Sequence, residues 1–151
     1  MSGRMGELLD HLGPLLGRAH EAHRVLTVAA LQGTGLSPKS FGALVVLEAE
    51  GPLSQGRLAA RQGIDRTTMV AVVDELERAG AVRRRRDERD RRAYALELTD
   101  EGRALLERAR GAVEDAERRF LEPLPAADRR ALKRALRTLV ERAGDPQTAR
   151  A

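Results

Sequence analysis

Apolar residues recur every three or four positions near the start of the chain, which is the spacing of an amphipathic helix. The pattern predicts a helix over residues 8–31, with a kink at Pro14 or a start just before it. After a glycine-rich break, Ser37-Pro38 supplies an N-cap and a first-turn proline for a second helix. Gly51-Pro52 ends that helix.

A short helix and a longer one follow. Ser54 is a good N-cap for a helix over residues 55–62, and Asp65 is a good cap for a helix over residues 66–79. Gly80 ends the longer helix. Two successive helices with this spacing predict a helix-turn-helix, and another kind of short helical hairpin remains the alternative.

Small residues stand where a helix-turn-helix requires them. Ala59 leaves room for the second helix to cross closely, and Gly63 permits the positive φ of a tight turn. Four apolar side chains are expected to fill the space between the two helices: Leu58, Ile64, Met69 and Val72.

The periodicity changes to two after Gly80, which predicts strands over residues 81–86 and 93–99 around a charged tip. A helix over residues 100–120 follows, and Pro123 and Pro125 end it. A last helix carries Leu132, Leu136, Leu139 and Ala143, and residues 144–151 are predicted to be a frayed tail.

The predicted fold is mostly α with a small β-hairpin wing, in one domain over residues 1–151. Within it we expect a winged helix-turn-helix over residues 37–99 and a helical dimerisation region over residues 8–32 and 100–143. The outer helices have apolar stripes that must be buried, and a second copy of the chain would bury them economically. A monomer that folds its own tail back is the alternative.

The charge of the chain is concentrated in the predicted hairpin. The sequence contains 27 Lys and Arg against 23 Asp and Glu, a net charge of +4. Residues 83–92 contain seven arginines and three acidic residues, so the rest of the chain has 20 of each sign. Arginine suits a narrow minor groove, where the negative potential is strong. The pattern favours DNA contact, and a solvated charge run is the alternative.

The first turn of the fourth helix would point at DNA bases and phosphates in the major groove. Threonines there can donate to phosphate, or they can serve only as caps, and both interpretations remain open. The candidate DNA-binding residues on this helix are Arg66, Thr67, Thr68 and Ala71, and those on the wing are Arg84, Arg86, Arg89, Asp90, Arg91 and Arg92.

The sequence resembles the MarR family of bacterial transcription regulators. The resemblance rests on residues 64–82, on the wing residues Asp90-Arg91-Arg92, and on Leu98-Thr99 with Gly102, and the order of helices and the length also fit. It implies a homodimeric repressor of double-stranded DNA that a small aromatic or phenolic effector relieves, with Arg92 in the minor groove and Asp90 orienting it. A two-fold dimer predicts a pseudo-palindromic operator.

Two histidines of the first helix, His20 and His23, could line an effector cleft, with packed or half-exposed histidines as the alternative. They also have a spacing that could hold a metal, but no third ligand is evident. We therefore expect no metal and no cofactor.

Other function classes find little support in the sequence. There are no cysteines, which excludes thiol chemistry and disulfides, and no phosphate-binding glycine loop or hydrolase motif, which disfavours an enzyme. No apolar run is long enough to span a membrane, so the expected location is cytoplasmic. The remaining alternative is a winged helix that docks an acidic protein partner through its arginines, and the salt dependence of binding separates the two.

Overall fold

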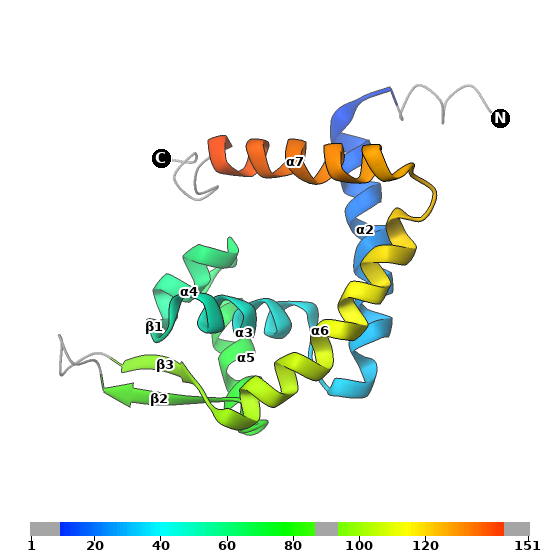
Figure 1. Cartoon of the computed structure of the whole chain (residues 1–151). Helices are drawn as coiled ribbons and strands as arrows, with labels where there is room; N and C mark the ends of the chain where they lie inside the picture. Colours follow the sequence, from blue (N-terminus) through cyan, green and yellow to red (C-terminus); the bar gives the residue numbers. More distant parts are fainter. Residues whose placement is uncertain (1–9, 87–93, 144–151) are drawn as a thin grey trace.

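The computed structural model describes residues 10–86 and 94–143, and Figure 1 shows the arrangement. The mostly helical fold with a small sheet is confirmed. Along the chain the elements are α2 (Leu12–Leu31), the 3-10 turn η1 (Gln32–Thr34), α3 (Pro38–Glu50), β1 (Leu53–Ser54), α4 (Gln55–Gln62), α5 (Arg66–Arg78), β2 (Val82–Arg86), β3 (Tyr94–Leu98), α6 (Asp100–Leu121) and α7 (Ala126–Ala143).

Side-chain caps start four of these helices, each at the residue where the sequence places the start. In every case a side-chain oxygen accepts a hydrogen bond from the backbone N–H three residues later, which satisfies a donor that the helix leaves unpaired. The bonds run from Ser40 to Ser37 (3.1 Å), from Arg57 to Ser54 (3.3 Å), from Thr68 to Asp65 (2.9 Å) and from Gly102 to Thr99 (3.0 Å).

The first helix starts just before its proline. α2 begins at Leu12, which places Pro14 in the first turn, where no backbone donor is needed. The start just before Pro14 is therefore confirmed, and residues 1–9 lie outside the described part of the chain.

The sheet has one strand more than the predicted hairpin. Its order is β1-β3-β2, with both neighbours of β3 antiparallel to it. Leu53 pairs with Leu96, and Val82 pairs with Leu98 at the base of the wing. The expected hairpin strands are confirmed, whereas β1 was missed because two residues are too few to show a period of two.

One apolar core holds the winged region together. α3 lies in its middle and packs against α4, α5 and α6, while α4 packs on α5 across the turn. Of the four side chains expected between those helices, Ile64 is half-buried and the other three are buried. The largest fully buried apolar side chains are Leu31, Leu44, Leu58, Met69, Leu76, Leu96 and Leu106.

The outer helices leave apolar surface uncovered. α2 runs along α6, and α7 crosses beyond the end of α6, away from the wing (Figure 1). α7 has no buried residue, and its Val140 is 71% exposed. α2 likewise has Leu12 63% exposed at its start. A single copy of the chain thus leaves apolar stripes of both helices open to solvent.

Thr99 joins the wing to α6. Its hydroxyl accepts from the Gly102 N–H and donates to the Gly80 carbonyl at 2.6 Å. We expect Thr99→Val, which keeps the shape but removes both bonds, to lower the free energy of unfolding by about 1 kcal/mol in urea denaturation. Thr138→Val is the control, because that exposed hydroxyl donates only to the Arg134 carbonyl of its own helix. Equal stability of both variants would contradict the capping role.

Candidate nucleic-acid interface

The turn between α4 and α5 has the geometry that the sequence predicts. Gly63 has a φ of 62° and adopts the left-handed conformation. The Ile64 N–H donates to the Ala59 carbonyl at 3.0 Å, which closes the turn. Ala59 is 4% exposed, so a larger side chain there would not fit between the packed helices. The turn thereby fixes the start of α5.

The start of α5 is held by a carboxylate that uses both of its oxygens. Asp65 accepts from the Thr68 N–H at 2.9 Å and from the Thr68 hydroxyl at 2.6 Å. The hydroxyl proton of Thr68 is therefore engaged in capping, which is the alternative that the sequence left open. Arg66 and Thr67 are exposed in the same turn.

The outer face of α5 is a continuous exposed surface. Ala71 lies on it one turn after Thr67, and Asp74 follows on the same side. Val70 also lies on this face and is 45% exposed, although it is not among the residues expected from the sequence. Its helical phase places it between Arg66 and Asp74, so a projection of the helix could have found it. An exposed valine among polar side chains is suited to contact a thymine methyl group.

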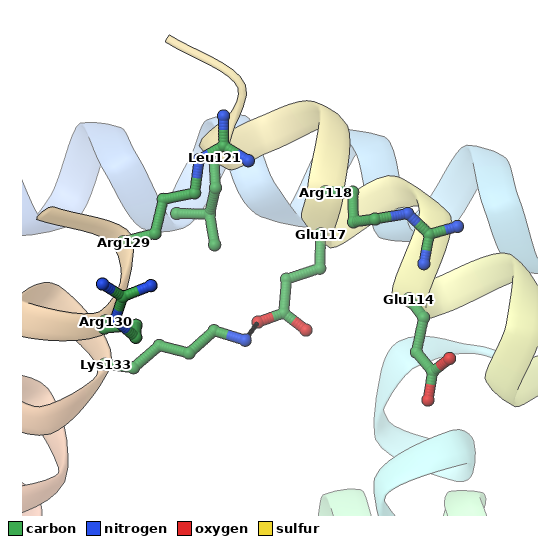
Figure 2. A pocket seen from close by; sticks show the side chains of 7 residues that line it. All are labelled: Glu114, Glu117, Arg118, Leu121, Arg129, Arg130 and Lys133. Carbon is green, nitrogen blue, oxygen red and sulfur yellow. Dashed lines mark ion pairs between the residues drawn. The ribbon is translucent and has the colours of Figure 1, made fainter. Parts of the chain in front are cut away.

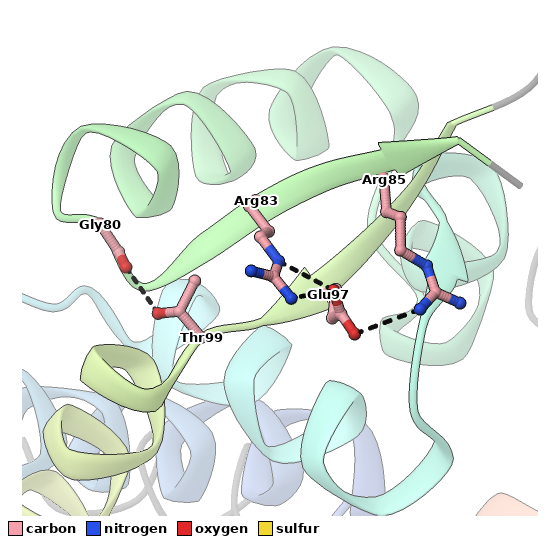
Figure 3. Close-up of polar contacts among 5 residues, drawn as sticks. All are labelled: Gly80, Arg83, Arg85, Glu97 and Thr99. Carbon is pink, nitrogen blue, oxygen red and sulfur yellow. Dashed lines mark hydrogen bonds and ion pairs between the residues drawn. The ribbon is translucent and has the colours of Figure 1, made fainter.

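The arginines of β2 alternate between two acidic partners. Figure 3 shows Glu97 of β3 between Arg83 and Arg85: the Arg83 Nε donates to Glu97 at 2.8 Å, and the Arg85 Nη1 forms an ion pair with it at 3.6 Å. Arg84 points the other way, and its Nε donates to Glu77 of α5 at 3.0 Å. The candidate residue Arg84 therefore links the wing to the helix whose outer face is exposed.

The other candidate wing residues divide into two groups. Arg86 is exposed at the end of β2, paired in register with Tyr94, which is 52% exposed. Arg89, Asp90, Arg91 and Arg92 lie outside the described residues, so their roles stay predictions.

Glu77 and Glu97 are not among the residues expected from the sequence, since each pairs with an arginine of a different element, seven residues away for Glu77 and 14 for Glu97. The arginine side chains of these pairs are 41–67% exposed, so the pairs are surface ion pairs of small energy. They orient the guanidinium groups, and they can be exchanged for contacts with phosphate.

Asp65 makes the stability of the winged region depend on pH in the acidic range. The hydrogen bond from the Thr68 hydroxyl, and then the Thr68 N–H, lower the pKa of Asp65 below its ordinary value. Because the folded pKa lies below the unfolded one, this stabilisation is complete above the unfolded pKa and is lost as pH falls through the folded pKa. We expect Asp65→Ser, a cap that does not titrate, to show a smaller loss of melting temperature than the wild type below about pH 4. Parallel acid profiles of the two proteins would contradict this role.

The two candidate effector residues line one hollow. His20 and His23 face an apolar hollow of about 470 Å³ between α2, α6 and α7. The His23 ring meets Phe120 edge to face, with 5.4 Å between ring centroids. A second hollow of about 410 Å³ adjoins it at the α6–α7 corner. Within residues 10–86 and 94–143, no three His, Asp or Glu side chains form a group that could hold a metal.

None of the helices that the structure describes combines the length and the apolar character of a membrane span.

Comparison with known proteins finds the same family by sequence and by structure. The model of the MarR family matches residues 34–93. The chain is 37% identical over 128 residues to the HTH-type transcriptional repressor Rv2887 of Mycobacterium tuberculosis, covering 85% of this chain and 92% of that protein.

Two solved structures are similar over most of their length. A transcriptional repressor, CouR, bound to a 23-mer DNA duplex matches with a TM-score of 0.83 and 38% identity, covering 89% of this chain and 96% of that chain. Rv2887 of Mycobacterium tuberculosis in complex with salicylic acid matches with a TM-score of 0.73 and 36% identity, covering 86% of this chain and 96% of that chain.

Proposed function

Because this chain belongs to the MarR family of transcription regulators, we propose that it binds a pseudo-palindromic operator in double-stranded DNA as a homodimer. The observation that supports this proposal most is that two candidate DNA-binding surfaces are directly connected. The exposed outer face of α5 and the arginine wing are joined by the ion pair of Glu77 with Arg84. A helix in the major groove and a wing along the adjoining backbone would then dock as one unit.

The residues that we propose to contact DNA follow from this docking. Arg66, Thr67, Val70 and Ala71 would face the major groove from α5. The wing would contribute its arginines, with Arg92 in the minor groove and Asp90 orienting it, as the family resemblance implies. Thr68 would act through the cap that positions Arg66 and Thr67.

The dimer would form through the outer helices, over residues 8–32 and 100–143. The exposed apolar side chains of α2 and α7 support this assignment, because a second copy of the chain would bury both stripes at once. Leu139 and Val140 of α7 are 54% and 71% exposed in the single chain. Two copies related by a two-fold axis would present two α5 helices to successive half-sites.

We propose that the protein is a repressor, without enzymatic activity, that acts on DNA in the cytoplasm and that a small aromatic effector relieves. Structures of relatives support relief by an aromatic effector, since Rv2887 was crystallised in complex with salicylic acid and CouR of Rhodococcus jostii RHA1 with p-coumaroyl-CoA. In this chain the hollow lined by His20 and His23 would hold the aromatic group. The ligand would change the spacing of the two α5 helices, so that the dimer could no longer bind both half-sites at once.

An electrophoretic shift assay on the intergenic DNA beside the protein's own gene tests this proposal. We expect a retarded complex with that DNA and none at the same protein concentration with a scrambled duplex. Salicylate, tested as one aromatic ligand, is expected to weaken the complex. Equal affinity for the two duplexes would contradict sequence-specific binding and would favour the alternative, an acidic protein partner for the arginine wing.

A further inference from the structure

Glu77 places a carboxylate on the outer face of α5. It follows Arg66 by three helical turns and Val70 by two, so the phase of the helix puts all three side chains on the same side. Asp74 lies on this side as well. The half of α5 nearer the wing therefore presents negative charge, which repels the phosphates of DNA.

Arg84 of the wing neutralises this carboxylate. Its Nε donates to both oxygens of Glu77, at 3.0 and 3.2 Å. We call Arg84 and Glu77 the junction pair, because they join β2 to α5. The two side chains are 41% and 31% exposed, so the junction pair is a surface ion pair that contributes little to stability. The partners can therefore separate without loss of the fold.

Arg84 lies on the face of the wing that is turned toward α5. It is in register with Leu96, a buried residue of β3. Successive residues of a strand point to opposite faces. Arg83 and Arg85 accordingly lie on the other face, where both contact Glu97 (Figure 3). The guanidinium of Arg84 thus stands in the corner between α5 and the wing.

This corner faces the DNA backbone if α5 and the wing dock as proposed. A sugar–phosphate strand separates a major groove from the neighbouring minor groove. A helix in one groove and a wing in the next therefore have phosphates between them. Arg84 suits a phosphate, because the planar donors of a guanidinium can bind two oxygens at once. Glu77 requires the same donors, so it competes with the phosphate for Arg84.

We propose that Glu77 limits the affinity of the protein for DNA, because it holds Arg84 in the free protein and has to release that side chain to a backbone phosphate on binding. The inference rests on the proposed function, and it names the residue that sets the strength of binding. Contacts with phosphate carry no sequence information. Glu77 therefore acts on affinity for any duplex and not on the choice of sequence.

The two members of the junction pair have opposite effects on binding. Glu77→Gln removes the competing charge and keeps the size of the side chain. The affinity of the dimer then rises by about tenfold, the product of about threefold at each of two wings. Arg84→Gln removes the ligand of the phosphate, so the affinity falls by about tenfold. The slope of log affinity against log salt also becomes shallower, by about one for each wing.

Glu50→Gln is the matched control. The Arg61 Nε lies 2.9 and 3.0 Å from the two oxygens of Glu50, which is the geometry of the junction pair, but this ion pair joins α4 to α3. The variant loses the same charge outside α5 and the wing, so it should change the affinity by less than about twofold. Glu117 is less suited as a control, because Figure 2 shows it paired with Lys133 at the α6–α7 corner, and both also line the proposed effector hollow.

Fluorescence anisotropy on the full chain tests the inference with two labelled duplexes, the operator and a scrambled sequence. The salt concentration is set low enough to measure binding to the scrambled duplex. We expect Glu77→Gln to bind both duplexes about tenfold more tightly than the wild type does. Urea denaturation should give similar free energies of unfolding for the two proteins, so the gain does not come from folding.

Four results would overturn the inference. Weaker binding by Glu77→Gln would show that Glu77 prepares Arg84 for DNA, and unchanged binding would show that the two do not compete. An equal gain in Glu50→Gln would assign the effect to net charge. A gain on the operator alone would point to a base contact. If the wild type binds the operator, each of these rejects only this inference, whereas a wild type that does not bind it rejects the proposed function and this inference together.

Discussion

Replacement of Gly102 by alanine is expected to lower the melting temperature by about 6–12 °C, which corresponds to about 3 kcal/mol for a chain of this size. A Cβ at this position would overlap the carbonyl oxygen of Ala81 and would lie 2.8 Å from Leu98 Cδ1. That carbonyl cannot move away freely, because it accepts the Thr99 N–H at 3.0 Å. Differential scanning calorimetry measures the shift.

Gly111→Ala is the matched control for this prediction. Gly111 lies in the same helix, α6, and a Cβ there would meet no atom within 4 Å. Alanine favours a helix over glycine, so this variant should be as stable as the wild type or more stable by about 0.5–1 kcal/mol. A Gly102→Ala protein with the wild-type melting temperature would show that α6 does not pass so close to the base of the wing.

Arg92→Ala is expected to weaken operator binding by about 5–150-fold, equivalent to about 1–3 kcal/mol, while the protein remains dimeric. The reason for this expectation is the proposed placement of the Arg92 guanidinium in the minor groove, where the potential is most negative. Fluorescence anisotropy with a labelled operator measures the affinity, and size-exclusion chromatography measures the dimer. Arg134→Ala removes the same charge from the exposed side of α7 and should bind as the wild type does. Equal affinities of the two variants would show that Arg92 does not contact the operator.

Local signals in the sequence predicted most of the fold. The caps Ser37, Ser54 and Asp65 and the left-handed Gly63 are each set by a few neighbouring residues, and the structure places them as expected. The strand β1 was missed because its two residues are defined by their partners in β3, far along the chain. A strand of two residues is too short to show the alternation of apolar and polar residues by which strands are recognised.

The candidate site was predicted less completely, for the same physical reason. The arginines of β2 were recognised from their number alone, whereas their directions depend on Glu77 and Glu97, which lie on other elements. Thr68 was selected as a DNA contact, yet its hydroxyl is engaged by Asp65. Val70 was overlooked because an apolar side chain in a helix is usually part of the core, although its helical phase already places it on the exposed face.

Gly102 has a structural role that the sequence motif containing it does not reveal. Leu98-Thr99 with Gly102 contributed to the family resemblance, but the physical reason for their spacing cannot be derived from the sequence. The structure supplies one: Thr99 ties α6 to Gly80, and Gly102 lets the first turn of α6 pass the Ala81 carbonyl. The motif therefore fixes the base of the wing relative to α6.

The affinity for the operator as a function of salt concentration tests the proposed interface most directly. If a dimer binds through α5 and two arginine wings, each copy forms several contacts with phosphate. For about 6–10 contacts in total, the affinity should fall by about 10³–10⁵ between 50 and 200 mM salt, along a straight line of log affinity against log salt. Operator binding that hardly changes over this range would contradict recognition through the arginine wing.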